Sequence, residues 1–202
     1  SGLKPYGSKE TRLDEIVEDH IEGSENKSDL LMYIYAIIVG FTTCVPQFFP
    51  GHASSLGYNA SFGSLLISLS MITNIISKII LGELSDKIGP KKAVFITTSI
   101  VLVGSILLLK NLVLYLGALM FGFCYAGSTV GLTSISREQY SNKEYLIKYP
   151  ILSFVSTLVN AFGSPVVGFI YDGTRSYNMT FVICIIMALI MLIDLFLLER
   201  KK

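Results

Sequence analysis

The chain has 202 residues, of which 51% are hydrophobic and 15% are charged, and its net charge is +1. A soluble domain usually carries charge on about a quarter of its residues, so this composition argues against a soluble protein. The near-zero net charge and the lack of a basic tract argue against nucleic-acid binding. Because the apolar residues fall in long blocks, we expect a polytopic helical membrane protein.

Residues 1–29 differ from the rest of the chain because they are polar and hold eight acidic residues. Apolar residues such as Leu13 and Ile16 share one helical face, which suits a short surface helix. A disordered linker is the equal alternative for so polar a segment. We therefore treat residues 1–29 as a separate region and residues 30–200 as the membrane domain.

Six apolar stretches follow, each close to the roughly 20 residues that a helix needs to cross a bilayer. They are too long to be strands of a membrane β-barrel, and they do not alternate as such strands do. We therefore predict an all-α membrane domain with six transmembrane helices. The expected spans are residues 30–49, 62–81, 93–109, 112–135, 150–171 and 179–198.

The cations outside these spans fall mainly on one side of the membrane. If the N-terminus is inside, nine lysines and arginines after the first span are cytoplasmic and two are external. Because cytoplasmic loops carry an excess of such residues, we predict a plasma-membrane protein with both termini in the cytoplasm. The nine are Lys87, Lys91, Lys92, Arg137, Lys143, Lys148, Arg200, Lys201 and Lys202, and the two are Lys110 and Arg175.

The segment Gly82–Lys92, between the second and third spans, is dense in charge and predicts a tight cytoplasmic turn. Gly82 allows two backbones to approach closely, and Gly89 allows a sharp reversal before Pro90, which suits the first turn of a helix. Asp86 is an acid at membrane depth, so we expect it to contact a donor or a helix N-terminus.

This segment resembles the G-x-L-S/A-D-K/R-x-G-x-K/R-K/R loop of the major facilitator superfamily. The resemblance implies half of a twelve-helix transporter that moves a small solute by alternating access. It makes this chain the C-terminal half, residues 1–29 the linker between halves, and an N-terminal six-helix half the partner of Asp86 at a gate. The residues assigned to the gate are Gly82, Leu84, Asp86, Lys87, Gly89, Lys91 and Lys92.

The junction between the fifth and sixth spans repeats part of this motif. Gly168 and Asp172 follow Gly82 and Asp86 at the same offset of 86 residues. An odd number of spans lies between the two junctions, so they face opposite sides of the membrane. Two inverted three-helix repeats predict this relation.

A second resemblance concerns the substrate. The stretch Gly168–Tyr177, followed by Phe181, resembles the G-x-x-x-D-x-T-G-S-Y…F segment of the oxalate:formate antiporter and monocarboxylate transporter branch, with Arg175 at the usual glycine. Residues 137–145 loosely resemble the F-G-x-K-x-F/Y loop of the same branch. These resemblances imply an organic anion such as a monocarboxylate, with a coupled proton or counter-anion. A non-transporting scaffold or sensor module is the alternative.

Polar side chains within the spans are the candidates for solute binding. Lys78 either meets a solute carboxylate or extends to the cytoplasmic face, as long cations near helix ends usually do. The amides of Asn74 and Asn160 bond either a solute or a neighbouring helix. The full candidate set is Lys78, Asn74, Asn160, Gln47 and Tyr33.

Four other features carry expectations. Pro46 and Pro50 bracket Gln47 and predict a kinked end to the first span. Tyr33 and Tyr35 lie near the inner boundary, where aromatic side chains anchor to the interface. His52 falls in the predicted outer loop 51–61 and Asp194 lies inside the sixth span, so we expect a solvated histidine and a capping or paired acid. Enzyme, cofactor and metal-ligand motifs are lacking, so we expect no catalysis, cofactor or metal.

Overall fold

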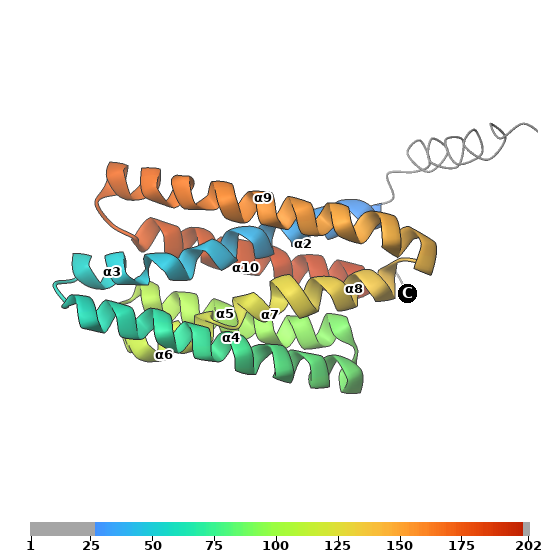
Figure 1. Cartoon of the computed structure of the whole chain (residues 1–202), viewed down its shortest axis with the longest axis horizontal. Coiled ribbons are helices and arrows are strands. Elements are labelled where there is room, and N and C mark those ends of the chain that lie inside the picture. The colour runs from blue at the N-terminus through green and yellow to red at the C-terminus, as the bar shows by residue number, and fades with distance from the viewer. Residues whose placement is uncertain (1–26, 200–202) are drawn as a thin grey trace, which may run out of the picture. The chain divides into compact units, whose positions relative to one another are not determined.

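The computed structural model describes residues 27–199, so most of the predicted linker over residues 1–29 lies outside the described residues (Figure 1). The chain divides into two compact units, residues 1–30 and residues 31–202. Residues 27–30 of the first unit are helical. The second unit contains the bundle, and the description below concerns that unit.

The bundle is entirely helical, and residues 27–199 contain no strand. Within this range six helical runs are long and apolar enough to cross a membrane, which confirms the predicted fold class. The elements are α2 (Lys27–Cys44), η1 (Val45–Phe48), α3 (Phe49–Ser55), α4 (Ala60–Ile88), α5 (Pro90–Leu109), α6 (Leu114–Phe121), α7 (Cys124–Ala126), η2 (Gly127–Gly131), α8 (Leu132–Gln139), α9 (Asn142–Thr174) and α10 (Asn178–Glu199).

The spans are longer than predicted, because charged segments continue the helices instead of forming loops. α4 runs through the motif to Ile88, so the expected eleven-residue turn is wrong and the reversal is confined to Gly89. α9 begins before Pro150, which lies inside the helix rather than at its start. A capping box of Ser141 and Glu144 satisfies the first N–H groups of α9 and so starts the helix outside the apolar stretch.

Two of the six spans are interrupted. The first passes from α2 through the 3₁₀ segment η1 into α3, and the prolines Pro46 and Pro50 each remove a helical N–H at this point. The kink predicted around Gln47 is therefore confirmed. The fourth span contains a π-helical turn, η2, between α7 and α8.

Span lengths repeat along the chain: 27, 29 and 20 residues are followed by 26, 33 and 21. In each set of three the first span is interrupted and the third is the shortest. Gly82 and Asp86 occupy the last two turns of α4, and Gly168 and Asp172 occupy the last two turns of α9. The α4–α5 and α9–α10 turns lie at opposite ends of the bundle, as two inverted repeats require (Figure 1).

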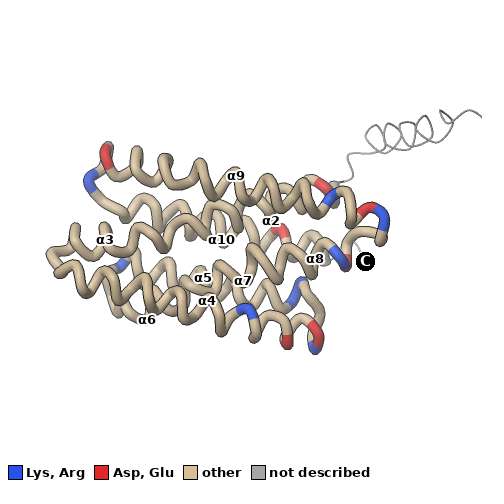
Figure 2. The backbone as a smooth tube through the Cα atoms, in the orientation of Figure 1, with Lys and Arg blue, Asp and Glu red and all other residues tan. Residues whose placement is uncertain are grey.

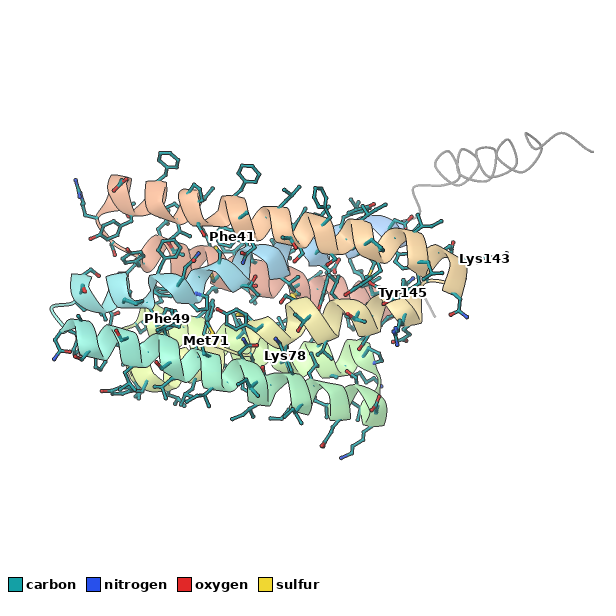
Figure 3. The ribbon with its side chains drawn as sticks, in the orientation of Figure 1. Phe41, Phe49, Met71, Lys78, Lys143 and Tyr145 are labelled. Carbon is teal, nitrogen blue, oxygen red and sulfur yellow. The ribbon has the colours of Figure 1, made fainter. Side chains whose placement is uncertain are left out.

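Buried side chains form two clusters. The first is centred on Tyr35, Leu132 and Leu195, and the second contains Phe49, Phe121 and Phe181. Phe49 (labelled in Figure 3) and Phe121 meet edge to face, and their ring centroids are 5.7 Å apart in the structure. Apolar side chains on the outer faces of α4 and α9 are exposed, as expected of surfaces that face lipid or another part of a membrane protein.

A close approach between α2 and α9 occurs at Gly40. A Cβ atom at this position would overlap the backbone carbonyl of Ser156 on α9. Only glycine leaves room for this contact, so the two helices pack backbone to backbone here.

We expect Gly40→Ala to lower the stability of the protein by about 1–3 kcal/mol, because the added methyl group forces α2 and α9 apart. Gly173→Ala is the matched control: a Cβ there meets nothing in the described chain, so helix propensity alone should make it neutral or stabilising by up to about 1 kcal/mol. Thermal unfolding in mild detergent measures both. Equal melting temperatures for the two variants would rule out the close contact.

Candidate functional site

The α4–α5 turn holds the motif residues in a well-defined geometry. Gly89 has φ 90° and ψ 152°, and its N–H donates to the Ser85 carbonyl at 3.0 Å. A side chain would be strained at this φ, so glycine is needed for the reversal. Pro90 then starts α5, as predicted. The charged residues of the motif gather at this end of the bundle together with those of the α8–α9 turn (Figure 2).

Asp86 and Gly82 present an open surface. Asp86 is exposed and has no hydrogen bond or ion pair within residues 27–199, whereas its neighbour Lys87 pairs with Glu83 at 3.8 Å. A Cβ at Gly82 would meet no atom of the described chain within 4 Å. The close approach expected at Gly82 is therefore not made within the described chain, whereas Leu84 packs on the first cluster.

Lys91 differs from the other motif cations because its side chain is buried, at 7% exposure. Its Nζ donates to the backbone carbonyl of Leu198 at 2.9 Å. The last carbonyls of a helix lack intrahelical partners and carry partial negative charge, so a cation is stabilised there. Lys91 therefore connects the start of α5 to the end of α10, whereas Lys92 is exposed.

Asn74 and Lys78 lie one turn apart on α4 and thus on the same helical face. Both side chains are half-buried (Figure 3 labels Lys78). The Lys78 ammonium has no hydrogen bond or ion pair with any described residue, and the buried Oδ1 of Asn74 has no hydrogen-bond partner among them. This face therefore presents a cation and an amide whose bonding capacity is unused by the described chain.

Asn160 and Gln47 both bond across the contact between α2 and α9. The Asn160 Nδ2 donates to Thr43 Oγ1 at 2.9 Å and to the Gly40 carbonyl at 3.4 Å. The Gln47 Nε2 donates to Ser164 Oγ. The amide oxygens of Asn160 and Gln47 accept no hydrogen bond from the described residues. Each amide therefore joins two helices and still offers an acceptor.

The two tyrosines near the start of α2 have different environments. Tyr33 is half-buried against the first cluster, and its hydroxyl has no hydrogen bond with residues 27–199. Tyr35 is completely buried, and its hydroxyl donates to the Gly127 carbonyl at 2.8 Å. A Cβ at Gly131 would lie 2.5 Å from this hydroxyl, so glycine makes room for it. The expected interfacial anchoring of Tyr35 is wrong, because its ring fills the space beside η2.

A polar and aromatic cluster between α8 and α9 is absent from the sequence predictions. Tyr149 OH lies 3.0 Å from Thr133 Oγ1, and Tyr145 stacks on Tyr149 with centroids 5.1 Å apart. The Arg137 guanidinium lies 5.4 Å from the Tyr145 ring centre, within range of a cation–π contact. The i, i+4 spacing of the tyrosines was the available signal, but it required knowing that residues 142–149 are helical.

At the other end of the bundle, His52 is buried in α3 with its ring centre 4.9 Å from that of Phe181. The expectation of a solvated loop histidine is wrong, because the first span continues to Ser55. Tyr177, in the α9–α10 turn, is arranged edge-on to the His52 ring, with their ring centres 6.1 Å apart. Partial burial, with smaller contributions from Tyr171 and Asp172, raises the pKa of Tyr177.

The sequence profile described as Major Facilitator Superfamily matches residues 31–202. The chain belongs to this superfamily. Its members are membrane transporters and generally not enzymes, so the chain is a multi-pass membrane protein of a transporter family, embedded in the lipid bilayer and acting on a small solute. A comparison with curated proteins gave no match. In the part of the chain that the structure describes, His, Cys, Asp and Glu side chains do not gather in threes as metal ligands.

We expect Lys91→Met to destabilise the protein by about 1.5–3 kcal/mol, the range for a hydrogen bond to a charged group, because the Leu198 carbonyl loses its donor. Lys92→Met is the matched control on the exposed side of the same turn and should change stability by less than about 0.5 kcal/mol. Thermal unfolding of each variant in detergent gives the comparison. Equal losses for the two would show that Lys91 acts only through net charge.

Proposed function

We propose that this facilitator chain is the C-terminal six-helix half of a transporter for a small organic anion such as a monocarboxylate. The observation that carries the proposal is the Lys78 ammonium, half-buried in a span and without an ion pair in the described chain. A cation at membrane depth is costly and needs a counter-charge. A solute carboxylate supplies that charge through short, charge-assisted hydrogen bonds.

The Asn74 amide is the nearest candidate to this cation in the proposed site. Asn74 lies one turn before Lys78 on the same face of α4, and its amide N–H groups are donors for the second carboxylate oxygen. We also assign three other side chains to the solute site, where they would accept hydrogen bonds or make apolar contacts with the solute: Asn160, Gln47 and Tyr33. Since Asn160 and Gln47 also join α2 to α9, these two helices would move as one unit while the solute is bound.

The turn after α9 supports the assignment to the monocarboxylate branch. Arg175 occupies the position where that branch has glycine, and its φ of 53° lies in the left-handed region that glycine adopts most readily. Thr174 Oγ1 bonds the carbonyls of Ile170 and Ser176 across the same turn. The backbone therefore has the conformation that the branch motif favours, although the side chain differs.

The open surface at the α4–α5 turn is proposed as the gate. Asp86 and Gly82 are free to meet another surface, and an N-terminal half would provide one. The Asp86 carboxylate would dock on a helix N-terminus there, through charge and dipole, and hold one access state closed. This end is assigned to the cytoplasm of a plasma-membrane protein, because cations gather there (Figure 2).

The alternative is a non-transporting scaffold or sensor module. It is favoured by one observation, the use of the Asn160 and Gln47 amides in contacts between α2 and α9. A module of this kind would bind a ligand without moving it across the membrane. Transport and binding assays therefore separate the two functions.

The test is uptake and counterflow of labelled small carboxylates in vesicles containing the full-length protein. We expect saturable exchange that Lys78→Ala reduces at least about tenfold and that Lys78→Arg partly restores, because one charge-assisted contact is worth roughly 1.5–3 kcal/mol. Lys143→Ala, at an exposed lysine in the first turn of α9, is the control and should leave exchange unchanged. Binding without exchange would favour the sensor module, and retention of full exchange in Lys78→Ala would exclude Lys78.

For the gate, we expect Asp86→Asn to shift the protein toward the state that is open at the cytoplasmic end, because the amide loses the charge that binds a helix N-terminus. A cysteine introduced at the exposed Ser54, at the outer end of α3, reports this shift through its rate of alkylation. The native Cys44, Cys124 and Cys184 are buried, so background labelling is low. Glu83→Gln is the matched control on the same turn, and an effect equal to that of Asp86→Asn would contradict the gate.

A further inference from the structure

Asp194 is a buried acid that the proposed transport site does not use. It lies near the end of α10, a helix that packs mainly against α5, and its side chain is 2% exposed. Neither carboxyl oxygen has a hydrogen-bond partner within residues 27–199. The expectation that this acid caps or pairs is therefore wrong for the described chain.

The side chains one turn before and one turn after Asp194 on α10 are apolar and buried. Met191, Leu195 and Leu198 of the same helix belong to the first buried cluster. Tyr35, on α2, belongs to the same buried cluster as these three residues. α5 contributes the buried cation Lys91. Its ammonium donates to the Leu198 carbonyl, one turn beyond Asp194 on α10. The other titratable groups in or against this cluster are Tyr33, Tyr140, Tyr145 and Tyr149.

An ionised carboxylate in such a place has lost its hydration and gained no donor in return, which makes the charged form very costly. The neutral acid avoids this cost, so burial of the group and binding of a proton favour each other. We propose that Asp194 is a proton-binding site, protonated in this conformation and ionised when water reaches α10. The only step is loss of the proton from the carboxyl group to water and its return.

Two features link the buried cluster that contains Met191, one turn before Asp194, to the π-helical turn η2. Tyr35, in the same buried cluster, donates a hydrogen bond from its hydroxyl group to the Gly127 carbonyl in the π-helical turn η2. A cavity of about 20 Å³ extends from η2 toward α10 and has room for one water molecule. Its polar walls come from Thr42, Thr97 and Thr98. π-Helical turns such as η2 are frequent at functional sites.

A role for this proton in driving solute transport rests on the proposed function. The proton-binding site itself does not depend on that function. Asp194 lies on α10, a helix that packs mainly against α5, whereas Lys78 lies on α4. Proton binding and solute binding can therefore be measured separately.

The first measurement is labelling of the full-length protein in membranes with dicyclohexylcarbodiimide, which reacts with protonated carboxyl groups in apolar surroundings. Peptide mass spectrometry would follow Asp194 between about pH 5 and about pH 9, with the exposed Asp86 and Asp172 as internal controls. We expect Asp194 to be labelled at neutral pH, and labelling to fall about tenfold per pH unit once the group ionises. The two exposed acids should remain unlabelled at neutral pH.

The second measurement is the alkylation rate of the Ser54→Cys reporter as a function of pH, which needs no solute. In the wild-type background the rate should change over the pH range in which Asp194 labelling is lost. Asp194→Asn should flatten this dependence, because the amide cannot ionise, whereas Glu83→Gln should leave it intact. If Asp194→Asn does not fold, the labelling curve and the pH-dependent alkylation of the wild type still have to coincide.

Each outcome decides the proposal. Coincident curves, flattened in Asp194→Asn, support a proton site linked to conformation. Absence of labelling at Asp194 at neutral pH overturns it, and so does a pH dependence that persists in Asp194→Asn. Failure of the organic-anion proposal would give a different result. Carboxylate exchange would be absent, while the labelling of Asp194 and the pH-dependent alkylation of Ser54→Cys would be unchanged.

Discussion

Inside a bilayer each backbone N–H and C=O group must find a partner within the protein, and this constraint governs the structure. Regular helices meet it unaided, so every interruption needs a polar side chain nearby. The carbonyl of Gly127 in η2 receives the Tyr35 hydroxyl, and Gln47 within η1 bonds Ser164 on α9. Lys91 meets the same need at the end of α10. Tyr35, Gln47 and Lys91 therefore lie where helices are broken, ended or joined.

Asp194 differs from these residues because no described residue donates a hydrogen bond to its carboxyl group. Asn74 and Lys78 on α4 also have hydrogen-bonding groups without partners in the described chain, but these two side chains are only half-buried. The degree of burial distinguishes Asp194 from Asn74 and Lys78. A half-buried group can exchange its bonds with water or a solute, whereas a fully buried acid can change only its proton. The fold thus offers distinct places for a solute and for a proton.

The sequence was sufficient to predict the class of fold, the six spans, the motif at Gly82–Lys92 and the kink at Pro46 and Pro50, because hydropathy, glycine and proline act locally. It did not reveal that α4 and α9 continue through charged segments, since hydropathy falls where a capping box or surface charge still favours helix. Nor did it reveal the contacts of Tyr35, His52 and Asp194. Those depend on which helices are neighbours, and the pattern of a single span carries no such information.

The bond between Lys91 and Leu198 has a consequence for how this chain can vary. The acceptor is a main-chain carbonyl, which every amino acid provides. Position 198 is therefore free to change among residues that fit the apolar cluster, while position 91 is not. Substitutions at the two positions would not be correlated in related sequences, so methods that infer contacts from paired changes would overlook the link between α5 and α10.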